Sequence, residues 1–189
     1  MSDNPNSDGG AKFSPVKGGK DSTGKVSIAS VEPGSSDLRV EAQFNPKELE
    51  ISRSVPWQKH DASNKSNSKS SEEKGIHLEF TGAEGRSISL ELLFDNYESE
   101  SGGRKVELKK NVETLEKLAS VRVAGSKKDD ERRPHRCVVT WGSALENFRC
   151  VIESLSTKYT MFAADGTPQR ATCVVKLKEA DVVSMAKKK

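Results

Sequence analysis

The stretch Asn147–Glu179, NFRCVIESLSTKYTMFAADGTPQRATCVVKLKE, decides the fold of this chain. Residues 147–162 and 169–179 are long β segments that flank a short connection. Asp165-Gly166 in that connection is a strong turn signal, because glycine adopts a positive φ angle at little cost. The second segment alternates apolar and polar residues with a period of two, which is typical of a half-buried strand. We therefore expect a hairpin of two long strands.

Shorter segments with strand-like patterns precede this pair. They cover residues 38–44, 48–57, 76–80, 88–94 and 137–141. The glycines at 82 and 85 lie between the third and the fourth of these segments, which predicts a β-hairpin there. Arg53 breaks the alternation of the second segment and leaves its register open.

The only convincing helix is predicted over residues 104–119. Its apolar positions recur at i, i+4, i+7 and i+11, which is the spacing of one helix face; they are Leu108, Val112, Leu115 and Ala119. The sequence thus predicts a mainly β fold, a β-barrel or sandwich of six or more strands with one α-helix.

The flanks and one internal stretch have a different composition. We expect residues 1–35 to be a flexible N-terminal tail, residues 36–183 to be the β domain and residues 184–189 to be a basic C-terminal tail. Residues 58–75 lack large apolar side chains and are predicted to be a polar, mobile loop.

The charge of the chain argues against nucleic acid as a partner. The 189 residues carry a formal net charge of +3, which Lys187, Lys188 and Lys189 account for entirely. Binding to many phosphates needs a concentrated basic face, which a neutral body does not supply. The chain also lacks an apolar run long enough to cross a bilayer and an apolar signal core, so we expect no membrane partner and assembly in the cytoplasm.

The sequence offers no constellation for catalysis, for a metal or for a cofactor. Cys137, Cys150 and Cys173 lack the spacing of a metal site or of a disulfide framework, and each lies among alternating apolar residues, so we interpret them as buried small hydrophobes. The histidines are widely separated and are expected to be exposed and solvated; they are His60, His77 and His135.

Three further candidates are equally weak. Ser143 lacks the second glycine of a nucleophile elbow. Gly82-Ala-Glu-Gly85 lacks the lysine of a phosphate-binding loop and does not lead into a helix. The acidic side chains before the helix lack the spacing of an EF-hand and suit the helix N-terminus instead; they are Asp95, Glu98 and Glu100. We therefore expect no enzymatic activity and a protein that works through its surfaces.

Three stretches, taken in order, resemble the N-terminal tube domain of contractile injection system baseplate proteins of the tube-initiator or tube-adaptor class. They are Phe44–Ser54 with Trp57, Leu78–Glu98, and Trp141–Thr172. The resemblance covers about residues 38–181. Many relatives continue into a LysM module that binds peptidoglycan or the hub, and no such module is expected in this chain.

The resemblance implies a phage tail-tube-like fold that assembles as a homohexameric ring. In that family the ring lies between the hub or spike and the stacked tube proteins, sets six-fold symmetry and lets the payload pass. It further implies that the chain becomes part of a phage tail-like particle, which stays cytoplasmic or is released. The alternative is a soluble adaptor that binds a protein or nucleic-acid partner through its loops and basic tail.

The far end of the long hairpin is the candidate interface. Residues 147–162 would span about 53 Å if fully extended, which is far longer than a usual strand. This end carries apolar side chains beside the turn, and aromatic and methionine side chains commonly anchor interfaces. The candidate residues are Tyr159, Met161, Phe162, Asp165 and Gly166. The alternative is that the strand bends and returns Tyr159, Met161 and Phe162 to the core of the same subunit.

Overall fold

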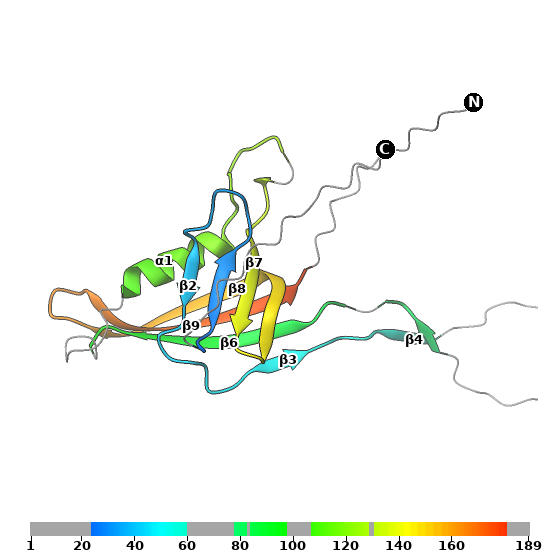
Figure 1. Ribbon diagram of the computed structural model, residues 1–189, viewed down its shortest axis with the longest axis horizontal. Coiled ribbons are helices and arrows are strands. Elements are labelled where there is room, and N and C mark those ends of the chain that lie inside the picture. The colour runs from blue at the N-terminus through cyan, green and yellow to red at the C-terminus, as the bar shows by residue number, and fades with distance from the viewer. Residues whose placement is uncertain (1–23, 60–77, 83, 98–106, 129–130, 181–189) are drawn as a thin grey trace, which may run out of the picture.

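The protein is represented by a computed structural model that describes residues 24–59, 78–82, 84–97, 107–128 and 131–180 (Figure 1). Within these residues the fold is mainly β with one α-helix, as predicted. In chain order the elements are β1 (Ser27–Ser30), β2 (Arg39–Glu41), β3 (Glu50–Ser52), β4 (Trp57–Lys59), β5 (Leu78–Phe80), β6 (Ser87–Asp95), α1 (Leu108–Ala119), β7 (Arg136–Trp141), β8 (Leu145–Phe162) and β9 (Pro168–Glu179).

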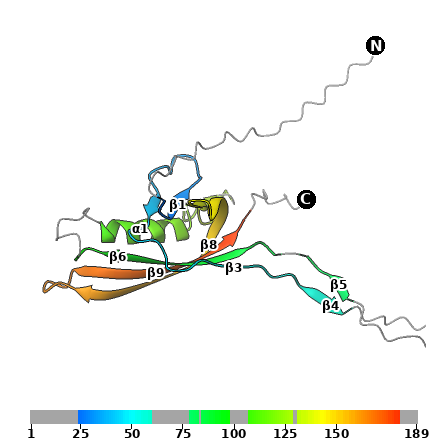
Figure 2. The same cartoon turned by 60° about the horizontal axis from the view of Figure 1, so that its bottom comes forward.

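Seven strands form one antiparallel sheet in the order β2-β1-β7-β8-β9-β6-β3, and β4 and β5 form a separate pair. The predicted barrel is corrected here, because in the described part of the chain the end strands β2 and β3 do not pair to close the sheet. Instead, α1 packs against β2, β8 and β9 and occupies the concave side of the curled sheet (Figure 2). The helix therefore covers the apolar side of the sheet, which further strands would cover in a closed barrel.

The two long strands confirm the pattern of the sequence, since β8 and β9 differ from the predicted segments by at most two residues at each end. The first part of β8 pairs with β7, and the remainder pairs with β9. The register between β8 and β9 shifts between Ile152 and Ser154. Such a bulge bends a strand and increases its twist, so β8 connects the two halves of the curled sheet.

The helix starts at Leu108, and residues 104–106 of the predicted helix lie outside the described residues. Leu108, Val112 and Leu115 are buried as the periodicity predicts. Leu118 is also buried, whereas Ala119 is only partly buried. The helix face thus lies against β2, β8 and β9. Its apolar side chains form one core with those of β1, β2, β6, β7, β8 and β9.

The N-terminal tail predicted over residues 1–35 is wrong for the part of it that the structure describes. β1 lies inside the sheet, hydrogen-bonded to β2 on one side and to β7 on the other. Val26 and Ile28 are fully buried. Four residues with few apolar neighbours in sequence form a strand here because both of their backbone edges are paired, with Ile28 opposite Val40 on one side and opposite Val139 on the other.

The hairpin predicted between residues 76–80 and 88–94 is also wrong in its pairing. β5 pairs with β4, and β6 pairs with β3 and β9. At Gly82 the backbone adopts a φ of +132°, and the chain continues in the same general direction rather than reversing. The result is a two-stranded extension that leaves the body of the molecule (Figures 1 and 2).

Two predicted segments lie mainly or wholly outside the described residues. Gln58 and Lys59, at the start of the predicted mobile loop, belong to β4, and residues 60–75 are not described. The basic tail at residues 184–189 is not described either.

Candidate functional site

The predicted interface residues lie at the turn that joins β8 to β9. Tyr159 and Phe162 are 39% and 58% exposed, and Met161 is half-buried. The rings of Tyr159 and Phe162 lie 6.5 Å apart between centroids. The structure thus leaves these aromatic side chains accessible instead of returning them to the subunit core. We call the segment from Tyr159 to Pro168 the tip.

The turn of the tip is held by hydrogen bonds within the chain. Gly166 has a φ of +84°, as the turn signal predicts. The Thr167 N–H donates to Asp165 Oδ1 at 2.9 Å, and the Ala163 N–H donates to the Thr167 carbonyl at 2.8 Å. The bonds from Thr167 lower the pKa of the exposed Asp165 carboxyl. The tip therefore presents two aromatic rings and one carboxylate on an ordered loop.

An ion pair fixes the base of the tip to the sheet. Arg170 on β9 donates from Nε to Asp95 Oδ2 on β6 at 2.8 Å. The Asp95 backbone is clamped in turn by the Gln43 side chain, which accepts from its N–H at 2.7 Å and donates to its carbonyl at 2.9 Å. The Tyr97 N–H donates to Asp95 Oδ1 at 2.9 Å. These bonds join β6, β9 and the segment after β2 at one end of the molecule.

The sheet of β6, β9 and β8 carries a second face that points away from α1. Its side chains are exposed or half-buried, whereas the residues that alternate with them on β6 and β9 are buried. Paired positions across the three strands give rows of mostly small, polar or charged residues, which we call the open face: Ser87-Lys178-Val151, Ser89-Lys176-Ser154, Glu91-Val174-Ser156 and Leu93-Thr172-Lys158. This face offers water-compatible chemistry, and its charged side chains are three lysines and one glutamate.

A second cluster is a buried carboxylate, Glu32, that three arginines contact beside β1 and β7. Glu32 is hydrogen-bonded by Arg136 Nε at 2.7 Å and by Arg133 Nη1 at 2.8 Å, and Arg122 Nη1 lies 3.2 Å from it. Burial alone would raise the pKa of Glu32, but the hydrogen bonds from Arg136 and Arg133 outweigh burial and lower it to about 2. The cluster ties the loop after β1 to the loop before β7.

His135 adjoins this cluster and corrects the prediction that the histidines are exposed. It is buried, and its Nδ1 lies 2.9 Å from the Ser30 hydroxyl oxygen. Burial and the nearby Arg122 and Arg133 lower the pKa of His135. His60 and His77 lie outside the described residues. No local sequence signal marks the Glu32 cluster, because its members come from positions about 90 to 104 residues apart.

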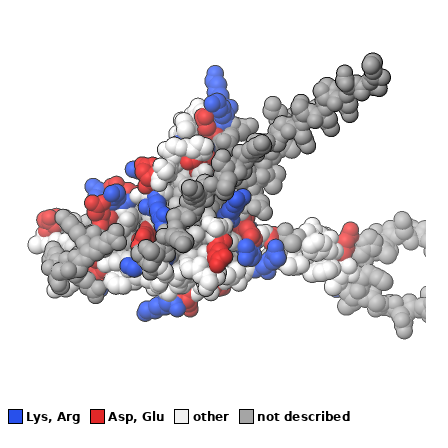
Figure 3. Space-filling model, viewed as in Figure 1, with Lys and Arg blue, Asp and Glu red and all other residues white. Residues whose placement is uncertain are grey.

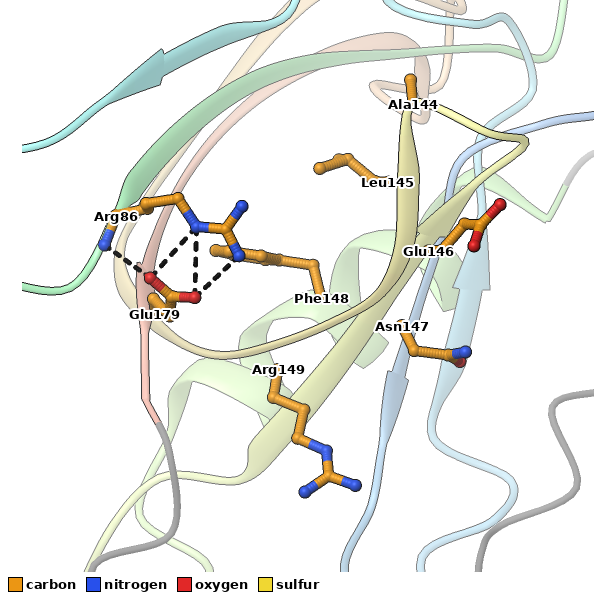
Figure 4. A pocket seen from close by; sticks show the side chains of 8 residues that line it. All are labelled: Arg86, Ala144, Leu145, Glu146, Asn147, Phe148, Arg149 and Glu179. Atoms are coloured by element: carbon orange, nitrogen blue, oxygen red, sulfur yellow. Dashed lines mark hydrogen bonds and ion pairs between the residues drawn. The ribbon is translucent and has the colours of Figure 1, made fainter.

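A shallow hollow of roughly 200 Å³ lies beside the start of β6 (Figure 4). Arg86 and Glu179 form a bidentate ion pair there, with the shortest N–O distance at 2.7 Å. The Arg86 guanidinium also lies over the Phe148 ring, 5.0 Å from its centroid. Arg86 and Glu179 neutralise each other, so we do not interpret the hollow as a binding site for a charged ligand. Their ion pair instead links the start of β6 to the end of β9.

The three thiols are buried, as the sequence predicts. Cys137 and Cys150 face each other across β7 and β8. Burial raises the pKa of Cys137 to about 12 and also raises those of Cys150 and Cys173, so these groups stay protonated. Among the residues that the structure describes, no cluster of three His, Cys, Asp or Glu side chains could hold a metal ion. Ser143 lies in the turn between β7 and β8, and Glu98 and Glu100 are not described.

The described helix is too short and too polar to cross a membrane. Comparison with protein families matches residues 24–188 to the family described as contractile injection system tube protein. The matched residues include both sheets, the helix, the tip and the open face. A comparison with curated proteins finds no match.

Proposed function

Since the chain belongs to the contractile injection system tube protein family, we propose that it forms the ring that joins the baseplate hub or spike to the inner tube. Family membership makes the chain a tube-related structural protein of a phage tail-like particle. The proposed ring contains six copies and templates the six-fold assembly of tube subunits. Its partners are other copies of this chain, the hub or spike protein and the tube protein.

The observation that carries this proposal is the open face of the β6-β9-β8 sheet. In a ring, this face would point inward and α1 would lie on the outer side. Serine, threonine and charged side chains remain solvated in a water-filled channel, and Lys158, Lys176 and Lys178 outnumber Glu91 on this surface. A lumen lined in this way would be water-filled and would carry more positive than negative charge.

The tip supplies the proposed subunit interface. Tyr159, Met161 and Phe162 lie beside the ordered Asp165-Gly166 turn, and exposed aromatic side chains on an ordered support are the typical anchors of protein interfaces. Assembly would begin in the cytoplasm, and the finished particle would stay there or be released.

Light scattering of the purified chain, alone and with its hub partner, tests the ring. A mass of six copies, alone or templated by the hub, is the expected result. A chain that stays monomeric in both samples and binds polyanions with a steep salt dependence would instead be the soluble adaptor.

A further inference from the structure

We propose that Cys137 and Cys150 form a reversible disulfide that locks β7 to β8 when the protein meets a small disulfide oxidant such as oxidised glutathione. The inference goes beyond the proposed function and does not depend on the ring. It assigns a modification site to two thiols that the proposed function leaves unused.

The two thiols are brought together by the pairing of the strands. Cys137 and Cys150 lie directly opposite each other in the β7–β8 ladder, so their side chains point to the same face of the sheet. The Cα atoms of opposite residues in an antiparallel pair are about 4.5 or 5.5 Å apart. A disulfide bridges Cα atoms that are about 4.4 to 6.8 Å apart. The fold therefore already holds the two cysteines within bridging range.

The third cysteine is placed differently. Cys173 lies opposite Thr157 of β8 and Leu92 of β6, and its Sγ lies 3.7 Å from Thr157 Oγ1. The β9 partner of Cys150 is Glu179, which is roughly 20 Å along the strand from Cys173 at about 3.3 Å per residue. The structure thus favours one pairing among the three thiols and leaves Cys173 as an internal control.

The place of the bond in the sheet gives it a structural effect. The strand order makes β8 the strand through which β2-β1-β7 is paired with β9-β6-β3. The β7–β8 ladder ends at Arg136 and Val151, the pair next to the two cysteines. Local opening takes place most readily where pairing ends. A covalent bond one pair from this end would hold the two halves of the sheet together.

Burial sets the conditions under which the bond forms. Cys137 and Cys150 are 0% and 1% exposed, and burial raises the pKa of both thiols. Because the thiolate is the attacking species, the reaction starts when the ladder opens or before the chain has folded. Basic and acidic side chains are interspersed on the face of the protein that Figure 3 shows, so no large patch of one charge sign repels glutathione there. Opening therefore sets the rate.

The chemistry is a thiol–disulfide exchange in two steps. The thiolate of one cysteine attacks oxidised glutathione, forms a mixed disulfide and releases one molecule of reduced glutathione. The thiolate of the other cysteine then attacks the cysteine sulfur of the mixed disulfide and releases the second glutathione. The protein loses two electrons and two protons, and the glutathione disulfide gains them.

The bond is expected to be reversible. The Cβ atoms of opposite residues are about 4.5 to 5.5 Å apart, whereas a disulfide needs about 3.5 to 4.5 Å. The two strands must therefore approach each other slightly, and a strained disulfide is reduced more readily than a relaxed one. The bond would be open in a reducing cytoplasm and closed in a particle that has been released into oxidising surroundings.

Refolding in a redox buffer tests the pairing. The full chain is refolded from urea at pH 8 with oxidised and reduced glutathione, the remaining thiols are blocked, and the peptides are mapped by mass spectrometry. The expected product has lost the mass of two hydrogen atoms, joins Cys137 to Cys150 and carries a blocked Cys173. Urea denaturation should then give an equilibrium constant for folding about ten- to a hundredfold higher than that of the reduced protein.

Matched variants separate the pair from the third thiol. Cys173→Ala should keep both the disulfide and the gain in stability, whereas Cys150→Ala should lose both. The mapping of the wild-type protein needs no substitution, so it decides the pairing even if Cys150→Ala folds poorly. A disulfide that includes Cys173, or free thiols at Cys137 and Cys150 after refolding, would overturn the proposal. An oxidised protein that is no more stable than the reduced one would overturn the locking of β7 to β8.

Discussion

Arg170 on β9 faces Asp95 on β6 across the register of the sheet and donates to its carboxylate from Nε at 2.8 Å. Asp95 is buried, whereas Arg170 reaches solvent with part of its side chain. Arg170, at the base of the tip, therefore supplies the positive partner that the buried Asp95 carboxylate needs.

Replacement of Arg170 by leucine should lower the free energy of unfolding by about 1.5 to 3 kcal/mol, because it removes hydrogen bonds to a buried charged group. Lys176→Ala on the same strand is the matched control, since Lys176 is exposed, and it should change stability by less than about 0.5 kcal/mol. Urea denaturation at pH 7 measures both. Equal losses would show that the Asp95 pair contributes little.

The Glu32 cluster predicts loss of stability in acid. The pKa of the Glu32 carboxyl is about 2 in the folded protein against an ordinary value of 4.5, so folding favours the charged form of this group. The stabilisation is present in full above about pH 4.5 and is lost as the pH falls towards 2. Its size is about 3 kcal/mol, since one pKa unit corresponds to about 1.4 kcal/mol. Denaturation curves recorded between pH 7 and pH 3 would follow this loss.

Glu32→Gln should destabilise the protein at pH 7 by about 3 to 5 kcal/mol, because it removes the charge that the partly buried arginines share. The variant should also lose much of the acid dependence. Glu91→Gln on the open face is the control and should keep both properties of the wild type. An unchanged acid dependence in Glu32→Gln would assign the effect to other carboxylates.

The helix face makes a prediction about the core. Leu115 is fully buried, so Leu115→Ala should cost about 2 to 5 kcal/mol of stability through the cavity that it leaves. Lys110 is largely exposed, and Lys110→Ala should have little effect. Similar small losses in both variants would mean that α1 does not pack on the sheet as described.

The buried cysteines should resist modification. Cys137, Cys150 and Cys173 have raised pKa values and no solvent access. Their reaction with a disulfide reagent at pH 8 should be at least about a hundredfold slower in the folded protein than in denaturant, because it requires local opening. Rapid labelling of the native protein would contradict their burial.

Periodicity predicted the elements whose character is local. The alternation of residues 169–179 correctly predicted which face of β9 is buried. The helical spacing of Leu108, Val112 and Leu115 correctly predicted the buried face of α1. The three cysteines followed from the same alternation. Each of these features depends on neighbours within the same strand or helix, which the sequence displays directly.

Features that depend on distant partners were missed. β1 is short and lies in a polar region, and only its pairing with β2 and β7 makes it a strand. Gly82 and Gly85 suggested a reversal, but β5 pairs with β4 and the chain continues past Gly82. Glu32 and the three arginines around it are far apart in the sequence, and only the folded structure brings them together. The tip was predicted as an interface because its aromatic residues adjoin a turn signal. The β4–β5 extension was not predicted, because only its pairing shows which of its side chains share a face.

We propose that six copies of this chain form a ring with the open face of β6, β9 and β8 towards the lumen. An electron cryo-microscopy reconstruction of the intact particle tests this arrangement. The expected map shows one six-fold ring of this chain between the hub and the tube, with Lys176 and Glu91 lining the channel and α1 on the outer side. A map in which this chain does not surround the tube axis, or in which α1 faces the lumen, would contradict this arrangement.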